Sequence, residues 1–267
     1  MICFPNAKIN LGLQIKSKRS DGYHNIESVF YPVPLCDAVE IVSGKKTSFT
    51  QTGFQLDSAP TDNLVMKSHS LLSGKYNVPQ LDIYLKKAIP SGAGLGGGSS
   101  DAAFMMRLLN DFCKLEISDA KLKKMVASVG ADCPFFIHNT PAIVSGTGNI
   151  FEPSDVSLKG YFLCIAKPPV SVSTKEAYSM VKPHKSDFSL SGLASIPVDK
   201  WKDVLYNDFE PCIFEKYPVI EECKNKMYSL GAEYAAMTGS GSAVFGLFKK
   251  TVSPTFPDCF VWTGMLK

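Results

Sequence analysis

The sequence predicts an α+β protein, because strand and helix patterns alternate without the regular strand–helix–strand period of a doubly wound sheet. Apolar and polar residues alternate with a period of two over residues 7–15 and 81–86, which predicts two half-buried strands. Apolar residues recur at helical spacing over residues 101–113 and 118–129, which predicts two amphipathic helices. With 267 residues and 45% apolar side chains, the chain is long enough for two domains.

The second half of the chain repeats this mixture of elements. A strand is predicted over residues 161–166, and a capping box from Ser173 to Glu176 predicts a helix that begins near Thr174. Further elements follow in the order helix, helix, helix, strand, over residues 199–206, 208–216, 218–230 and 243–248. The turn-forming stretch at residues 152–155 separates the halves, so we expect domains over residues 1–153 and 154–267.

Charge and cysteine content exclude several classes of protein. The 28 basic and 25 acidic side chains are scattered in short clusters, so we expect no nucleic-acid partner. The eight cysteines form no Cys-x-x-Cys pair, which argues against a metal cage and favours reduced thiols. No secretory signal pattern and no apolar run of about 18 residues is present, so we expect a cytoplasmic protein that does not bind membranes.

A glycine-rich loop between Pro90 and Ser100 is the strongest chemical signal in the sequence. It contains five glycines, follows the strand at residues 81–86 and precedes a helix for which Ser99 or Ser100 is the predicted N-cap. Glycines let backbone N–H groups approach an anion, and a helix N-terminus adds partial positive charge. The sequence therefore predicts a phosphate-binding loop.

The type of phosphate loop is narrowed by exclusion. No segment matches the Walker A pattern, and protein-kinase signatures are absent. Gly92, Gly94 and Gly97 do match a dinucleotide-binding fingerprint, with Glu116 at the position of a ribose-binding acid. That alternative, a nicotinamide-dependent oxidoreductase, requires a strand before Glu116, where the pattern predicts a helix.

Three ordered segments resemble the motifs of the GHMP kinases, a superfamily of small-molecule ATP-dependent kinases. The segments are Pro5 to Leu11, Pro90 to Ala103 and Met237 to Gly246. The resemblance implies an N-terminal lobe of the ribosomal-protein-S5 domain-2-like type and a C-terminal ferredoxin-like lobe. It also implies ATP, accompanied by Mg²⁺, as the phosphoryl donor. The ATP-binding residues it implies are Pro90, Ser91, Gly92, Ala93, Gly94, Leu95, Gly96, Gly97, Gly98, Ser99 and Ser100, the last also as a possible Mg²⁺ contact.

Within the superfamily, the chain resembles the members that phosphorylate the 2-hydroxyl of 4-diphosphocytidyl-2-C-methyl-D-erythritol. This resemblance rests on the run from Ala7 to Leu13, the run from Asp21 to His24, the triple glycine at 96–98 and the run from Gly130 to Pro134. It implies that Tyr23 and His24 hold the cytosine, with Tyr178 as a second stacking ring. Outside such a motif, a Tyr-His pair at a turn is more often surface structure.

The same resemblance assigns the chemistry to two residues. Asp132 would accept the proton of the substrate hydroxyl, and Lys8 would keep Asp132 ionised and offset charge on the transferring phosphoryl group. Asn10 shares the strand face of Lys8 and would bind substrate or fix the lysine. Gly239, Ser240 and Gly241 would bring backbone N–H groups towards phosphate or substrate.

Two further alternatives remain open at this point. Another GHMP kinase could act on a small alcohol that carries no cytidine group. A non-catalytic RNA-binding module could share the S5-like fold, although a near-neutral chain with Lys8 and Asp132 in kinase motifs argues against it.

Overall fold

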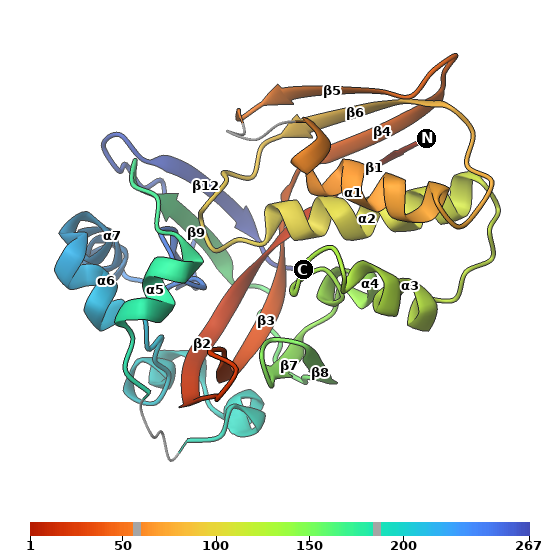
Figure 1. Ribbon diagram of the computed structural model, residues 1–267. Coiled ribbons are helices and arrows are strands. Elements are labelled where there is room, and N and C mark those ends of the chain that lie inside the picture. Colours follow the sequence, from red (N-terminus) through yellow and green to blue (C-terminus); the bar gives the residue numbers. More distant parts are fainter. Residues whose placement is uncertain (56–59, 184–187) are drawn as a thin grey trace. The chain divides into compact units, whose positions relative to one another are not determined.

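The structure is a computed structural model that describes residues 1–55, 60–183 and 188–267. Strands and helices are mixed along the chain, which confirms the predicted α+β class (Figure 1). The chain forms two compact units, each assembled from segments that are distant in sequence. The first unit comprises Met1–Ala7, Leu35–Ser91 and Gly96–Thr140; the second comprises Lys8–Pro34, Gly92–Leu95 and Pro141–Lys267. The expected division of the family domains after residue 153 stays a prediction.

The first unit is built on a four-stranded sheet. Its strands, in spatial order, are β1 (Ile2–Cys3), β4 (Ala38–Ser43), β6 (Leu81–Lys87) and β5 (Ser48–Gly53). The β5–β6 pair is parallel, and the other two pairs are antiparallel. Alternate residues of β6 face the core, as the period-two pattern predicted, and the last of these core-facing residues is Lys87.

Helices complete the first unit. They are η1 (Pro60–Asp62), α1 (Leu64–Ser73), α2 (Gly97–Phe112), α3 (Asp119–Val126) and α4 (Phe135–His138). Helices α1 and α2 pack side by side, and α2 also contacts β1 and β4 of the sheet (Figure 1). Asn63 caps α1 by accepting a hydrogen bond from the backbone N–H of Val65 at 2.9 Å.

The start of α2 corrects the predicted N-cap at Ser99 or Ser100. The helix begins at Gly97, and its N-cap is Gly96 in the left-handed conformation, with φ +70°. A Cβ on Gly97 would lie 2.8 Å from Cγ2 of Ile89, so the chain packs too closely there for any larger residue. The helix therefore starts three or four residues earlier than expected, because glycine permits both the turn and the close approach.

Two four-stranded sheets lie in the second unit. One has the order β2 (Asn6–Lys18), β3 (His24–Cys36), β7 (Ala142–Ser145) and β8 (Ile150–Pro153), with β2 and β3 as two long strands (Figure 1). The other has the order β10 (Tyr234–Met237), β11 (Val244–Phe248), β9 (Phe162–Lys167) and β12 (Phe260–Met265), and all its pairs are antiparallel.

The β10–β11–β9–β12 sheet confirms the predicted ferredoxin-like lobe, except that one of its two helical connections is missing. Helices connect β9 to β10, and β10 and β11 form a hairpin, as in a β-α-β-β-α-β unit. Residues 249–259, which are all described, contain no second helix before β12. Apolar side chains from β9, β10, β11 and the helices form one hydrophobic core under this sheet.

The helices of the second unit are α5 (Thr174–Met180), η2 (Leu190–Ser195), η3 (Val198–Asp203), α6 (Glu210–Lys216) and α7 (Pro218–Ser229). One bond of the predicted capping box is present, because Ser173 Oγ accepts a hydrogen bond from the Glu176 N–H at 3.1 Å. The Glu176 carboxylate accepts from Lys216 Nζ at 2.5 Å and from the Tyr217 hydroxyl at 3.0 Å. The element expected over residues 199–206 is a short 3₁₀ helix, and α6 begins at Glu210 rather than at residue 208. The difference at α6 lies at an element end, where turns compete with helix.

All eight cysteines are free thiols, as predicted from their spacing. Cys133, Cys164 and Cys223 are fully buried, and the other five are partly exposed. None of the helices in the described ranges combines the length and apolarity that a membrane span requires.

Candidate functional site

The three predicted motifs meet within the second unit. Lys8 and Asn10 lie on β2, the residues Gly92–Leu95 form part of the glycine loop, and Thr238 is the second residue of the third motif. The Lys8 N–H donates to the carbonyl of Leu95 at 2.9 Å. Thr238 Oγ1 accepts from the Asn10 N–H at 3.1 Å and lies 3.2 Å from the carbonyl oxygen of Gly94. Segments separated by more than 200 residues thus form one hydrogen-bonded cluster.

Lys8 is held in a buried environment, with 3% of its surface exposed. Its Nζ donates to Asn10 Oδ1 at 2.5 Å and lies 4.5 Å from the centre of the Phe30 ring. An ammonium over an aromatic face is attracted by the ring quadrupole. Asn10 thus contacts Lys8, and whether it fixes the lysine or binds substrate stays a prediction.

The glycine loop packs so closely against the third motif that position 94 requires a glycine. A Cβ at this position would lie 2.0 Å from the Thr238 carbonyl oxygen, and the residue has φ +73°. The neighbouring backbone also pairs with the third motif, because the Ala243 N–H donates to the Ala93 carbonyl at 3.2 Å. Only glycine fits where two backbones approach this closely.

The third motif forms a tight loop at Gly239, Ser240 and Gly241. Both glycines have positive φ, +57° and +89°. The side chain of Asn207 binds this loop: its Nδ2 donates to the carbonyls of Met237 at 2.8 Å and Gly239 at 2.9 Å. Sequence reasoning missed Asn207; the signal was a polar residue immediately before a predicted helix, where its Oδ1 accepts from a backbone N–H.

Two of the three predicted cytosine-binding residues are brought together. The His24 and Tyr178 rings are stacked, with centroids 5.0 Å apart and an interplanar angle of 22°. Phe209, which the sequence did not single out, packs edge-on against Tyr178. Tyr23 is 68% exposed and is not part of this stack. Burial, reinforced by the charge of Lys18, lowers the pKa of His24, so its ring favours the neutral form.

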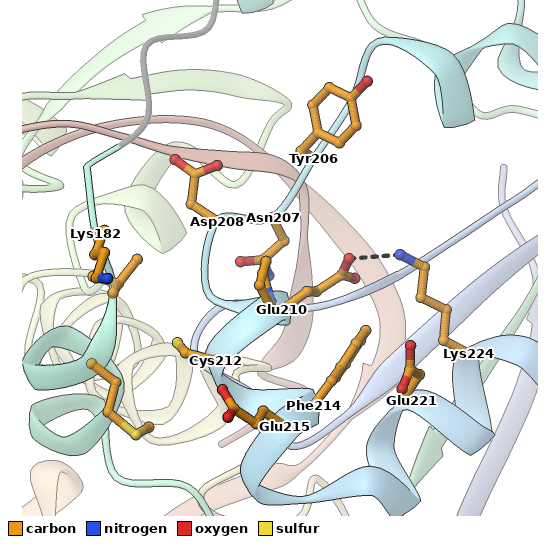
Figure 2. Close-up of a pocket in the computed structure, with 13 residues that line it drawn as sticks. Lys182, Tyr206, Asn207, Asp208, Glu210, Cys212, Phe214, Glu215, Glu221 and Lys224 are labelled. Atoms are coloured by element: carbon orange, nitrogen blue, oxygen red, sulfur yellow. Dashed lines mark hydrogen bonds and ion pairs between the residues drawn. The ribbon is translucent and has the colours of Figure 1, made fainter.

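A cavity of about 860 Å³ lies elsewhere in the second unit, between the end of α5 and helices α6 and α7 (Figure 2). Its wall includes Glu210, which accepts from Lys224 Nζ at 2.6 Å and from the Met237 N–H at 2.8 Å. Burial raises the pKa of Glu210 although Lys224 opposes this. None of the predicted site residues lines this cavity.

The first unit contributes the other part of the glycine loop, at the N-terminus of α2. Ser100 is fully buried there, and its Oγ has no hydrogen-bond partner among the described residues. Gly97, Gly98 and Ser99 belong to the same first turn, whose N–H groups have no carbonyl partners within the helix. This combination suits an anion and its accompanying cation.

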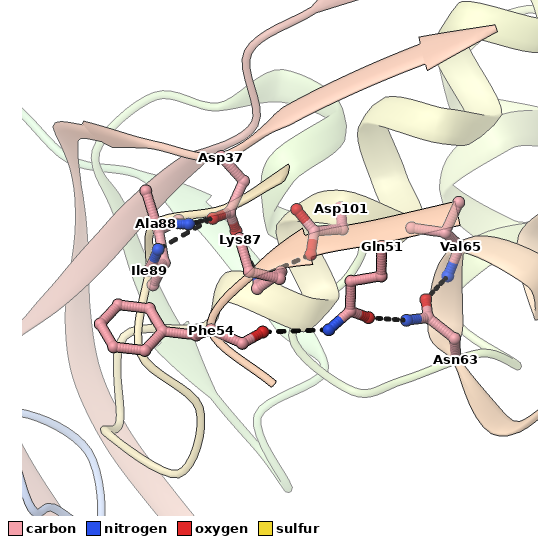
Figure 3. A network of polar contacts seen from close by, with 9 residues as sticks. All are labelled: Asp37, Gln51, Phe54, Asn63, Val65, Lys87, Ala88, Ile89 and Asp101. Carbon is pink, nitrogen blue, oxygen red and sulfur yellow. Dashed lines mark hydrogen bonds and ion pairs between the residues drawn. The ribbon is translucent and has the colours of Figure 1, made fainter. Parts of the chain in front are cut away.

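A buried charge cluster joins the two ends of this loop (Figure 3). Lys87 Nζ binds Asp37 Oδ2 and, at 2.7 Å, Oδ2 of Asp101, the fifth residue of α2. Asp37 Oδ1 accepts from the N–H groups of Ala88 at 2.6 Å and Ile89 at 2.8 Å. The residues just before the loop are thereby connected to the helix just after it.

The charges of this cluster are unequal, because one ammonium faces two carboxyl groups. Burial alone would lower the pKa of Lys87, but Asp101 and Asp37 outweigh burial and raise it. Burial and the charge of Asp37 raise the pKa of Asp101 to about 8, against the opposing effect of Lys87. Asp101 Oδ1 has no partner among the described residues. The cluster therefore retains a proton on Asp101 that an exposed aspartate would lose.

Asp132 lies in the first unit, in the turn of residues 131–134 that precedes α4. It is half-buried, and its carbonyl accepts from the Phe135 N–H at 3.2 Å. Burial raises the pKa of the adjacent Cys133 thiol to about 12, so this thiol stays protonated. In the described parts of the chain, no group of three or more His, Cys, Asp or Glu side chains is arranged to hold a metal ion.

The dinucleotide-binding alternative is contradicted. Helix α2 runs to Phe112, and residues 113–118 form a turn and an irregular segment before α3. Glu116 lies in this segment with φ +55°, and no strand precedes it. The strand–loop–helix–strand unit that a Rossmann site requires is absent there.

Comparison with known proteins places the chain in a family. The model for the "GHMP kinases N terminal domain" matches residues 63–140, and the model for "GHMP kinases C terminal" matches residues 191–254. The chain is 56% identical to the 4-diphosphocytidyl-2-C-methyl-D-erythritol kinase of Parabacteroides distasonis, over all of both chains. It is 36% identical to the enzyme of that name from Thermodesulfovibrio yellowstonii, over 93% of this chain and 90% of the relative.

Solved structures agree with this relationship. A crystal structure of 4-(cytidine 5'-diphospho)-2C-methyl-D-erythritol kinase is 30% identical and superposes with a TM-score of 0.79, covering 92% of this chain and 90% of that one. The mevalonate kinase of Methanococcus jannaschii shares the fold, with a TM-score of 0.71 at 12% identity and coverages of 100% and 98%. The chain therefore belongs to the GHMP kinases.

Proposed function

We propose that the protein transfers the γ-phosphoryl group of ATP to the 2-hydroxyl of 4-diphosphocytidyl-2-C-methyl-D-erythritol. The products are the 2-phosphate and ADP, a step of the non-mevalonate route to isopentenyl diphosphate. The observation that carries the proposal is the single cluster formed by Lys8, Asn10, the glycine loop and Thr238. The full-length relative with 56% identity bears the name of this enzyme, which supports the choice of substrate.

The glycine loop and the first turn of α2 would hold the ATP phosphates. Backbone N–H groups at Gly97 and Gly98 and the partial positive charge of the 16-residue helix would stabilise the phosphate oxygens. Ser100 fits a contact to Mg²⁺ or phosphate, because its buried Oγ has no partner among the described residues. When bound, Mg²⁺ would neutralise charge between the β- and γ-phosphates.

Lys8 and Asp132 would act on the reacting groups. The Lys8 ammonium, fixed by Asn10 and Phe30, would offset the negative charge that develops on the transferring phosphoryl group. Asp132 would accept the proton of the substrate hydroxyl as the new P–O bond forms, a contribution typically worth about 10²–10⁴ in rate. Phosphoryl transfer depends mainly on such positioning and charge stabilisation.

The His24–Tyr178 pair would recognise the cytidine group. These two rings and Phe209 form an aromatic surface on which a pyrimidine can stack, and His24 can hydrogen-bond a base edge. Base stacking on an aromatic ring is typically worth about 1–3 kcal/mol. Tyr23, exposed at the neighbouring turn, would close over the base from outside.

The test is ADP release by the purified protein with Mg-ATP and four alcohols in parallel: the cytidine substrate, methylerythritol phosphate, homoserine and mevalonate. We expect turnover with the cytidine compound, a loss of at least 100-fold in Asp132→Asn, and no loss in the exposed control Asp155→Asn. Turnover confined to another alcohol would replace the substrate within the same family. No turnover with any alcohol would contradict a kinase function for these compounds.

A further inference from the structure

One face of the β2–β3 hairpin carries the environment of Lys8. Lys8 and Asn10 are two residues apart on β2, and Ser28 and Phe30 are two residues apart on β3, so each pair points to the same side of its strand. All four side chains are buried, with at most 3% of each residue exposed. Two of them, Ser28 and Phe30, have no part in the function proposed above beyond the contact of Phe30 with Lys8.

The donor and acceptor roles in the hydrogen bonds of Ser28 are fixed by its partners. Its hydroxyl donates to the carbonyl of Gly12 at 2.6 Å, so the same oxygen can only accept from Asn10. Asn10 Nδ2 lies 2.8 Å from it and is the donor. With Nδ2 directed at Ser28, the carbonyl oxygen of the Asn10 amide is directed at Lys8, whose ammonium can only donate.

Reversal of the Asn10 amide would be unfavourable at both ends. Nδ2 would then face the Lys8 ammonium, and Oδ1 would face an oxygen whose hydrogen is already used. The Thr238 hydroxyl is compatible with this orientation, because its one hydrogen can go to Asn10 Oδ1 or to the Gly94 carbonyl, each at 3.2 Å. A buried chain of aligned hydrogen bonds of this kind is mutually strengthening.

We propose that Ser28 is a positioning residue for phosphoryl transfer: it fixes the orientation of the Asn10 amide and thereby the position of the Lys8 ammonium. The Phe30 ring, 4.5 Å from Lys8 Nζ, supports the ammonium from the same strand. The inference rests on the proposed role of Lys8 in the transfer. It goes further by assigning a function to a hydroxyl that touches neither substrate nor ATP.

The experiment compares Ser28→Ala with Ser17→Ala. Ser17 is a matched control, because its Oγ accepts a hydrogen bond from Asn25 Nδ2 at 2.9 Å on the same two strands. Ser28→Ala is expected to lower kcat about 5- to 30-fold, the size expected for a lost buried hydrogen bond, with KM for both substrates changed less than twofold. Ser17→Ala is expected to leave kcat unchanged.

A double-mutant cycle separates positioning from a general effect on folding. In an Asn10→Ala background, Ser28→Ala is expected to cause no further loss of kcat, since its effect passes through Asn10. Ser28→Cys, which nearly keeps the volume but offers only a weak acceptor, is measured in parallel and should show the same loss as Ser28→Ala. Side-chain amide NMR signals of Asn10 should shift in both Ser28 variants, a readout that does not depend on turnover.

The possible failures are distinguishable. If Ser28→Ala and Ser28→Cys keep wild-type kcat, or lower it by the same factor with and without Asn10, the inference is wrong while the proposed function stands. If Lys8→Met retains full kcat, the role of Lys8 fails and the inference fails with it. If the wild-type protein phosphorylates no alcohol of the panel, the proposed function itself is contradicted.

Discussion

Replacing Lys87 by methionine tests whether the buried charge cluster secures the phosphate loop. The substitution removes the cation that the carboxyl groups of Asp37 and Asp101 share. Both aspartates are buried, with 2% of Asp37 and 3% of Asp101 exposed. Breaking a buried ion pair by removing one partner typically costs about 3–5 kcal/mol. Lys86→Met is the matched control, because Lys86 is exposed on the opposite face of β6, and it should change stability by less than about 0.5 kcal/mol. Urea unfolding followed by circular dichroism measures both free energies.

The pH dependence of the same variants gives a second test. The raised pKa of Asp101 means that the folded state binds a proton that the unfolded state releases, so stability falls as pH rises from about 4 to about 8. Lys87→Met removes the one opposing charge and so raises this pKa further, and its deficit relative to the wild type should therefore grow as pH rises above about 8, by at most about 1.4 kcal/mol per pH unit for one proton. Combining Lys87→Met with Asp37→Asn and Asp101→Asn should recover most of the loss. The reasoning is refuted if Lys87→Met is as stable as Lys86→Met at pH 8.

Two further predictions concern stability and follow from single contacts. Gly94→Ala should lower the free energy of unfolding more than Gly160→Ala. Both glycines have positive φ, a conformation that costs an alanine about 1–2 kcal/mol. A Cβ at Gly94 would in addition lie 2.0 Å from the Thr238 carbonyl oxygen, whereas nothing lies within 4 Å of a Cβ at Gly160. Equal losses in thermal or urea unfolding would rule out the close backbone approach. Asn63→Ala removes the cap bond to the Val65 N–H and should cost about 0.5–2 kcal/mol by urea unfolding, and an unchanged midpoint would contradict that cap.

Local patterns in the sequence predicted the parts of the fold and site that depend on neighbouring residues. The alternation over residues 7–15 correctly indicated β2, with Lys8 and Asn10 on one face, but the expectation of a half-buried strand was wrong, because both faces are buried over these residues. The run of glycines before a helical pattern correctly indicated the strand–loop–helix order. Asp21-Gly22 is a typical turn-forming pair and lies in the turn between β2 and β3, where the Gly22 N–H donates to the Arg19 carbonyl. Each of these signals lies within a few residues of its consequence.

Contacts between distant segments could not be predicted in the same way. Lys87 continues the core-facing series of β6, but its partner Asp37 lies 50 residues away, and no pattern links the two. Asn207 supports a loop 30 residues later in the chain. The edge strand β5 was missed because most of its residues are at least partly exposed on both faces, so apolar and polar residues do not alternate.

The central claim is tested most directly by identifying the product formed from Mg-ATP and 4-diphosphocytidyl-2-C-methyl-D-erythritol labelled with ¹³C at C2. The account predicts a new phosphomonoester signal in the ³¹P spectrum that couples to the labelled carbon, with the cytidine diphosphate signals retained and one ADP formed per product. A phosphoryl group attached at another hydroxyl, or hydrolysis of ATP without a phosphorylated alcohol, would contradict it.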